Sequence, residues 1–225
     1  MLGNRLAACA EFVKGDRACD VGTDHGYLAA ELLLSGKCSF AIAADINEKP
    51  LESARNTLHK HGLDERSRTV LSDGVRNVDL DGVTDIIIAG MGGELISNIL
   101  SQKPLDGINL VLQPMTKAPS LRRFLAENGF ELLGETAVTE SGRLYTVMNA
   151  VFTGKKREIS ELETLVGKLS PTEGNARQLL LSIAEKLKKE ADALKASGNA
   201  EQSEHRRSLS EQIIQLAENE RSAAL

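Results

Sequence analysis

The stretch Asp20-Val-Gly-Thr-Asp-His-Gly-Tyr-Leu28 decides the fold of this chain. It follows one short apolar run and opens another, so it predicts a strand, a glycine turn and the start of a helix. Gly22 and Gly26 allow the backbone to approach a ligand closely, and the helix start offers unpaired N–H groups. The spacing is not the G-x-G-x-x-G of a dinucleotide site, and the carboxylates of Asp20 and Asp24 would repel a pyrophosphate. The loop therefore favours a cofactor that has a positive centre and no phosphate groups.

Helical and strand patterns alternate on both sides of this loop. Thr84 to Ala89 is a nearly continuous apolar run, which is typical of a parallel strand buried on both faces. Further strands are expected at residues 17–22, 40–45, 68–71 and 109–113, and helices at residues 4–13, 28–35, 49–61, 95–100 and 120–128. Residues 130–138 and 144–152 are expected to pair antiparallel, because the connection between them is too short for a crossover helix. This order predicts an α/β fold with a doubly wound, Rossmann-like sheet.

The composition changes after Thr153, where strand patterns disappear. We expect a helix at residues 159–169 and then a helical hairpin, a short antiparallel coiled coil with its turn at Ala196-Ser-Gly-Asn-Ala200. The apolar positions expected to hold the hairpin together are Ile183, Leu187, Ala191 and Leu194 on the first helix and Leu209, Ile213, Leu216 and Ala217 on the second. The sequence thus predicts a sheet domain, residues 1–153, and a helical domain, residues 154–225.

Composition excludes several classes of protein. With 225 residues, of which 41% are hydrophobic and 26% charged, the chain is neither collagen-like nor disordered. No apolar run approaches the ~20 residues that cross a bilayer, and the N-terminus is too weakly apolar for a signal peptide, so we expect a cytoplasmic protein without a membrane partner. The 3 cysteines are odd in number and widely spaced, which argues against a disulfide framework and a zinc site. We expect buried thiols and no metal.

The acidic excess lies entirely in the first part of the chain. Residues 1–153 hold 15 basic and 20 acidic side chains, whereas residues 154–225 hold 12 of each, which gives the net charge of -5. Proteins that bind nucleic acids usually show a basic balance, so this count by itself argues against such a partner.

Acids and glycines end three further strands. Asp45 lies about 20 residues beyond the first loop, where an acid binds a ribose diol in Rossmann-like folds. Ile46 and Asn47 follow and are placed to flank an adenine ring, and Asp73-Gly74 is placed at its amino group. S-adenosylmethionine, with its sulfonium, ammonium and ribose, fits this pattern. The residues expected to bind it are Asp20, Gly22, Thr23, Asp24, His25, Asp45, Ile46, Asn47, Asp73, Gly74, Gly90, Met91, Gly92 and Gly93.

Four other motifs accompany the first loop: Gly90-Met-Gly-Gly-Glu-Leu-Ile96, Leu112-Gln-Pro-Met115, Leu121-Arg-Arg-Phe-Leu-Ala-Glu-Asn-Gly129 and Tyr145. With it, they resemble the bacterial tRNA (adenine(22)-N1)-methyltransferases over nearly the whole chain, including the helical hairpin that such proteins carry as a tRNA-contacting element. The resemblance implies a class I methyltransferase sheet and transfer of a methyl group from S-adenosylmethionine to N1 of an adenine in the D-arm of tRNA.

The implied chemistry suggests roles for a few side chains. N1 has a free lone pair, so the difficulty is access, because the base must leave its stem. Asp24 and Gln113 are candidates to accept the amino protons of the adenine, and Tyr27 to stack on it. His25 is either a base or a loop histidine bonded to Asp24. Tyr27 has packing in the first helical turn as its alternative, and a core role is favoured for Tyr145.

The tRNA-binding surface must be local if the chain is acidic overall. Arg5 is placed to hold a phosphate or else is a surface residue without a role, and Lys155-Lys156-Arg157 is either a tRNA contact or a solvated linker. Sparser basic positions are Lys14, Arg17, Arg122 and Arg123. Two alternatives stay open: a small-molecule methyltransferase, which the acidity favours, and a methyltransferase-like adaptor without activity. We expect a monomer.

Overall fold

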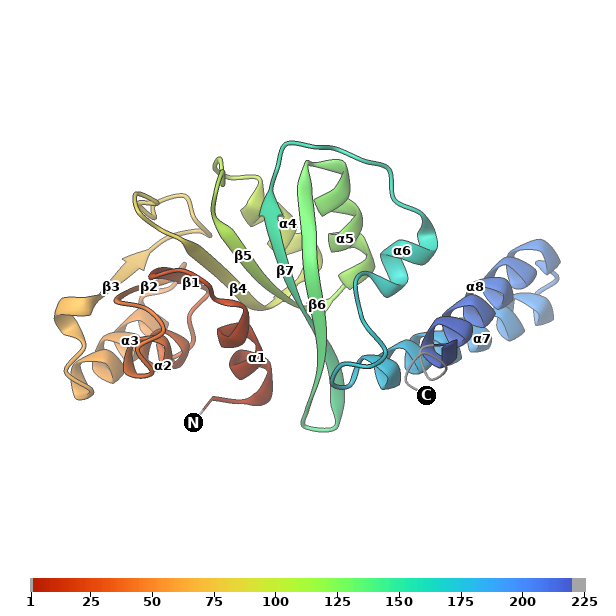
Figure 1. Cartoon of the computed structure of the whole chain (residues 1–225), viewed down its shortest axis with the longest axis horizontal. Coiled ribbons are helices and arrows are strands. Elements are labelled where there is room, and N and C mark those ends of the chain that lie inside the picture. The colour runs from red at the N-terminus through yellow and green to blue at the C-terminus, as the bar shows by residue number, and fades with distance from the viewer. Residues whose placement is uncertain (1, 220–225) are drawn as a thin grey trace.

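The computed structural model describes residues 2–219, and its core is a seven-stranded sheet of order β3-β2-β1-β4-β5-β7-β6 (Figure 1). Strands β1 to β5 are parallel, and β7 pairs antiparallel with both β5 and β6. The strands are β1 (Arg17–Val21), β2 (Phe40–Asp45), β3 (Ser67–Leu71), β4 (Asp85–Gly92), β5 (Asn109–Thr116), β6 (Phe130–Glu140) and β7 (Arg143–Phe152). The predicted α/β class is confirmed.

Helices cover both faces of the sheet. Along β4, Ile87 packs against α1 and α2, whereas Ile86 and Ile88 point to the other face, against α4 and α5. All three isoleucines are fully buried, which explains the continuous apolar run in the sequence. The helices of the sheet region are α1 (Asn4–Phe12), α2 (Tyr27–Leu34), α3 (Glu48–Lys60), the 3₁₀ helix η1 (Asp64–Arg66), α4 (Gly93–Leu100) and α5 (Ala118–Glu127).

Strand β4 is longer than the apolar run that predicted it. It continues to Gly92, and its pairing with β5 is irregular between Ala89 and Met91 and again between Met91 and Gly92. Gly90 has a φ of 79°, a conformation that favours glycine. The glycines expected to form a loop after the strand thus form a bulged strand end, from which α4 starts directly.

The helix after the sheet is shorter than expected. α6 spans Glu161–Val166 instead of residues 159–169. Ser160 and Glu163 form a capping box that fixes its start. Gly167, with a φ of 58°, ends it.

The C-terminal helices α7 (Ala176–Ala196) and α8 (Ala200–Asn219) pack side by side and extend away from the sheet (Figure 1). The hydroxyls of Ser203 and Ser210 donate to the carbonyls of Ala191 and Ala184, at 2.7 and 2.8 Å. The predicted apolar positions are only partly right, because Ile183 and Leu194 are half-buried and Leu216 is exposed. The buried apolar positions are Ala176, Leu180, Ala184, Leu187, Ala191, Leu209, Ile213 and Ala217.

The hairpin starts beside the carboxyl edge of the sheet, at the end of β6. The backbone N–H of Asn175 donates to Ala137 O at 3.3 Å, and its side chain donates to the Thr139 hydroxyl at 3.1 Å. The division into domains at residues 153 and 154 stays a prediction, and residues 220–225 of the expected helical domain lie outside the described residues.

Candidate active site

The strand order reverses between β1 and β4, and open α/β sheets bind ligands outside the carboxyl ends of the strands at such a point. The loops after β1, β2 and β3 are tied together there. The N–H groups of Gly22 and Thr23 donate to Ala44 O at 2.8 and 3.0 Å, and the N–H of Ser72 donates to Asp45 O at 2.8 Å. The acids and glycines singled out in the sequence therefore gather at one edge of the sheet.

Gly22 shows why the first loop needs glycine. Its φ is 78°, and a Cβ at this position would collide with the terminal methyl group of Met91. The loop after β1 thus touches the bulged end of β4.

Asp20 is the buried acid of this site, with only 6% of its surface exposed. Burial raises the pKa of its carboxyl to about 6, the Thr23 hydroxyl lowers it somewhat, and the negative charges of Asp45 and Asp24 raise it further. Thr23 Oγ1 is buried too: it lies near enough to the Asp20 carboxyl to lower its pKa, but within residues 2–219 it makes no hydrogen bond of normal geometry. A buried acid beside an unpartnered hydroxyl fits a ligand that brings a positive charge and polar atoms of its own.

Asp24, His25 and Tyr27 lie at the exposed rim of the same loop. His25 Nε2 lies 3.4 Å from Asp24 Oδ1, and the imidazole stacks on the Tyr27 ring with centroids 5.4 Å apart. The side chain of Asp24 is 85% exposed, and 53% of Tyr27 is exposed. This geometry favours an exposed ring over packing in the first helical turn, and it leaves a carboxylate free to accept hydrogen bonds.

The ends of β2 and β3 offer the features of a nucleoside site. Asp45 Oδ1 accepts a hydrogen bond from the N–H of Asn47 at 2.7 Å, and no group within residues 2–219 donates to its second oxygen. Ile46 is 61% exposed, an apolar surface that suits an adenine face. Asp73 forms an exposed ion pair with Arg76 at 3.1 Å, and Gly74 follows it with a φ of 62°.

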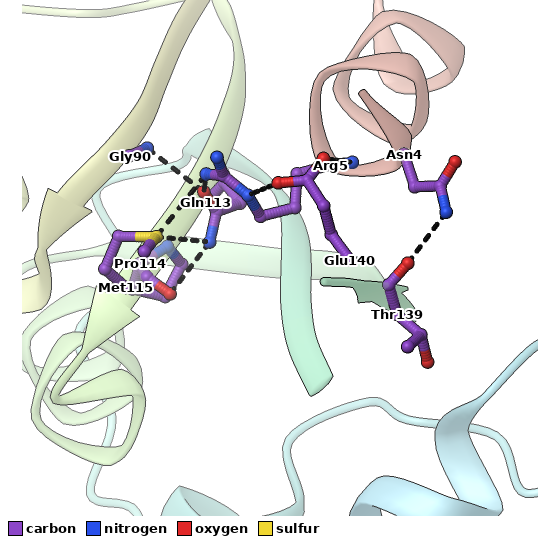
Figure 2. A network of polar contacts seen from close by, with 8 residues as sticks. All are labelled: Asn4, Arg5, Gly90, Gln113, Pro114, Met115, Thr139 and Glu140. Atoms are coloured by element: carbon purple, nitrogen blue, oxygen red, sulfur yellow. Dashed lines mark hydrogen bonds and ion pairs between the residues drawn. The ribbon is translucent and has the colours of Figure 1, made fainter. Parts of the chain in front are cut away.

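Gln113 is fully buried. Figure 2 shows its side chain in contact with both Gly90 and Arg5. Its Oε1 accepts hydrogen bonds from the N–H of Gly90 at 3.1 Å and from Nη1 of Arg5 at 2.7 Å. Its Nε2 donates to Pro114 O at 3.0 Å. The carboxamide is thus fully engaged within the protein, which does not favour the predicted role of accepting adenine amino protons.

Arg5 is placed by a residue that the sequence did not single out. Its Nε donates to Glu140 Oε2 at 2.5 Å, and its guanidinium lies over the Tyr145 ring, 5.2 Å from the centroid. Glu140 ends β6, about 135 residues away along the chain, so no motif or spacing links the two. Arg5 is therefore not a surface residue without contacts.

The cluster Lys155-Lys156-Arg157 is not brought together with Arg5. It follows β7, whose last residues pair with the first residues of β5, so it lies at the amino edge of the parallel strands. β5 has 8 residues, which puts the two edges roughly 25 Å apart. Arg157 is also paired with Glu163 at 3.0 Å.

Other basic positions of the sequence are engaged within the fold. Arg122 is buried in an ion pair with Glu135, so its expected place on a tRNA-binding patch is wrong. Lys14 Nζ donates to Asn149 Oδ1 at 2.8 Å, and the Arg17 guanidinium covers the Phe40 ring at 4.5 Å. Both precede or start β1 and so lie at the amino edge of the sheet.

A groove of about 720 Å³ runs from the end of β5 along α5 to α6 and α7. Pro114, Met115 and Tyr145 line the end that adjoins Gln113 and Arg5. Three exposed cations also line it, Lys117, Arg123 and Lys186, and each meets a carboxylate only at 3.7 to 4.0 Å. Such loose pairs contribute little, so these cations are available to another partner. The sequence had no signal for this groove, because it joins segments far apart in the chain.

Within residues 2–219, no helix is long and apolar enough to cross a membrane, and no cluster of three or more His, Cys, Asp or Glu side chains could hold a metal ion. Cys9, Cys19 and Cys38 are free and buried, as expected, and burial raises the pKa of each thiol.

The sheet order and the acidic, glycine-rich strand ends define a class I methyltransferase, and a family model described as a methyltransferase domain matches residues 2–148. The chain is 30% identical, over 223 residues, to the tRNA (adenine(22)-N(1))-methyltransferase of Bacillus subtilis (strain 168), a match that covers 97% of this chain and 88% of that one. It belongs to the tRNA (adenine(22)-N1)-methyltransferase family, which confirms the resemblance drawn from its motifs.

Solved structures agree. The structure of the B. subtilis m1A22 tRNA methyltransferase TrmK matches with a TM-score of 0.82 at 26% identity, covering 95% of this chain and 99% of that one. A Streptococcus pneumoniae protein assigned to the tRNA (m1A22) methyltransferases, solved in complex with S-adenosyl-L-methionine, matches with a TM-score of 0.80 at 29% identity, covering 95% and 100%.

Proposed function

We propose that this chain methylates N1 of adenine 22 in the D-arm of tRNA, with S-adenosylmethionine as the methyl donor. The observation that carries the proposal is the site at the ends of β1 and β2, where the buried Asp20 carboxyl lies beside the unpartnered Thr23 hydroxyl. A cofactor with a positive charge and no phosphate groups suits this site, whereas a dinucleotide does not. Membership of the family supports the choice of tRNA as the substrate.

The residues that would hold the cofactor come from three strand ends. Asp20 and Thr23 would bind its charged amino acid end. The open oxygen of Asp45 would accept the ribose hydroxyls, while Ile46 and Asp73-Gly74 would bind the adenine face and edge. When bound, S-adenosylmethionine supplies an activated methyl group on its sulfonium.

The target base needs positioning more than it needs a strong base. N1 of adenine already has a lone pair, so the rate depends on alignment of N1 with the methyl group and on extrusion of the adenine from its stem. The exposed carboxylate of Asp24 would accept the amino protons of the base, and Tyr27, stacked on His25, would offer it a flat face. Gln113 would act indirectly, by holding the end of β4.

The tRNA body would lie along the groove between α5 and α7. This groove adjoins the site at Met115 and Tyr145, and Lys117, Arg123 and Lys186 would meet phosphates there. We prefer this surface to Lys155-Lys156-Arg157, which lies at the opposite edge of the sheet. The hairpin would then contact tRNA through α7, on the side that faces α5.

The alternatives are less well supported. A small-molecule methyltransferase would need no groove with cations beside its site, and an adaptor would not need the buried Asp20, whose burial in charged form is costly. A cytoplasmic location and a monomeric state fit a tRNA-modifying enzyme and are part of the proposal.

The test is methyl transfer from radiolabelled S-adenosylmethionine to an unmodified tRNA transcript with adenine 22, compared with the same transcript carrying guanine 22. The proposal expects label only in the first, as 1-methyladenosine. Label on both transcripts would reject the position, and label on neither, with cofactor bound, would reject tRNA methylation.

A further inference from the structure

A chain of polar contacts runs from the end of β6 through α1 to the bulged end of β4. Glu140 accepts from Arg5 Nε at 2.5 Å and from the Arg5 backbone N–H at 3.3 Å. Arg5 Nη1 donates to Gln113 Oε1 at 2.7 Å, and that oxygen also accepts from the N–H of Gly90 at 3.1 Å. Figure 2 shows these four residues converging from four separate elements.

The contacts fix which way the Gln113 carboxamide faces. Its carbonyl oxygen receives two donors, one of them a cation, and its amide group donates to Pro114 O at 3.0 Å. The reversed amide would set two donors against Arg5 and Gly90, which is strongly unfavourable in a fully buried site. Arg5 thus adds a charged donor that strengthens the orientation in which Gln113 binds Gly90.

Gly90 is the residue through which the Gln113 carboxamide contacts the end of β4 at the active site. It lies in the irregular segment between Ala89 and Met91, with a left-handed φ of 79°, so the regular ladder to β5 does not hold its N–H. The Gln113 side chain supplies the missing acceptor. Met91, the next residue, lies against Gly22 of the first loop.

We propose that Glu140 and Arg5 are positioning residues that act through Gln113 to hold the Gly90 bulge in the geometry needed for methyl transfer. The inference rests on the proposed function. Glu140 makes its contacts with Arg5 and lies outside the group of cofactor-binding acids, so its effect would be larger on turnover than on cofactor affinity. The Glu140 carboxylate holds one side of the Arg5 guanidinium. The hydrogen bond from Arg5 in turn keeps the pKa of Glu140 below its usual range.

Glu140→Ala could also lower activity only because α1 packs less firmly on the sheet, and the protein offers a matched control for this effect. Asn4, next to Arg5 in α1, donates to Thr139 O, next to Glu140 in β6, at 2.7 Å. Asn4→Ala removes a contact between the same two elements but leaves Glu140, Arg5 and Gln113 untouched.

The experiment compares wild type, Glu140→Ala, Asn4→Ala, Arg5→Met and the double variant Arg5→Met/Glu140→Ala. For each we would measure kcat on adenine-22 tRNA, the Kd of S-adenosylmethionine, and hydrogen exchange of the Gly90 amide. Glu140→Ala is expected to lower kcat about 10- to 100-fold, a cost typical of small misplacements near reacting atoms, and to change Kd less than about 3-fold. Gly90 exchange should rise at least about 10-fold, and Asn4→Ala should change neither kcat nor exchange by more than about 3-fold.

The double variant tests the order of the contacts, because Glu140→Ala should add nothing once Arg5 is lost. Equal losses for Asn4→Ala and Glu140→Ala, or unchanged kcat and Gly90 exchange in Glu140→Ala, would overturn the proposal. If wild type bound the cofactor and did not methylate tRNA, the proposed function would fail, and the Gly90 exchange rates would still decide whether Glu140 and Arg5 hold the bulge.

Discussion

Arg122 and Glu135 form a two-pronged ion pair inside the protein, with Nε–Oε1 and Nη2–Oε2 distances of 2.8 and 2.6 Å. Both side chains are essentially buried, at 3% and 0% exposure. Nη1 of Arg122 also donates to the carbonyls of Thr164 and Leu165, at 2.7 and 3.0 Å, near the end of α6. The pair therefore connects α5 and β6 to α6, the helix that precedes the hairpin.

Glu135→Ala should destabilise the protein by about 3–5 kcal/mol, because it leaves the Arg122 guanidinium buried without its counter-charge. Urea unfolding at equilibrium would measure this loss. Arg123→Ala is the matched control, since Arg123 is the next residue of α5 and forms only a loose surface pair with Glu127 at 3.9 Å. It should change the free energy of unfolding by less than about 0.5 kcal/mol. Similar losses in the two variants would contradict the structural role of the buried pair.

Asp20→Asn should abolish cofactor binding and yet stabilise the cofactor-free protein near neutral pH. In the folded protein the pKa of Asp20 is raised from 3.8 to about 6, so its charged form is disfavoured there. Burial of the Asp20 carboxylate lowers the free energy of unfolding only where this group is ionised. The loss is absent below about pH 4, grows as the pH rises towards about 6, and stays constant at about 3 kcal/mol above that. The difference in unfolding free energy between variant and wild type, measured from about pH 4 to about pH 7, should grow accordingly. A difference in unfolding free energy that does not vary with pH would contradict the raised pKa of Asp20.

Asp45→Ala and Asp24→Ala should affect different steps. Asp45→Ala should weaken the binding of S-adenosylmethionine about 10- to 100-fold, because the ribose hydroxyls lose a charged hydrogen-bond acceptor. Asp24 lies exposed at the rim, so Asp24→Ala should lower the single-turnover rate more than it lowers cofactor affinity. Calorimetry and rapid-quench kinetics would separate the two effects. An unchanged single-turnover rate in Asp24→Ala would reject its role towards the base.

The two basic surfaces make opposite predictions for tRNA binding. Lys117→Glu/Lys186→Glu, in the groove beside the site, should weaken tRNA binding at least about tenfold and reduce the dependence of affinity on salt. Lys155→Glu/Lys156→Glu makes the same change of charge at the far edge of the sheet and should have a smaller effect. Filter binding at several salt concentrations would compare them. A larger loss of tRNA affinity in the second variant would mean that tRNA binds at Lys155-Lys156-Arg157 and not in the groove.

Local patterns predicted most of the fold, since periodicity and glycine punctuation fix each strand and helix within a few residues. β2 was predicted with its observed bounds, and the antiparallel pair β6 and β7 was expected from the short connection between them. Asp20, Gly22 and Asp45 could be singled out because their places at strand ends are local features. Burial of Arg122, the contact of Arg5 with Glu140, and the groove beside Tyr145 depend on pairing between distant segments, which a single sequence does not reveal.

Methylation of adenine 22 in tRNA is tested most directly by locating the methyl group on the tRNA. Wild-type protein, S-adenosylmethionine and an unmodified tRNA transcript with adenine 22 should yield 1-methyladenosine at that position, found by mass spectrometry of nuclease fragments, and Asp20→Asn should yield none. Methylation of another nucleotide, or of a small molecule in place of tRNA, would contradict the account.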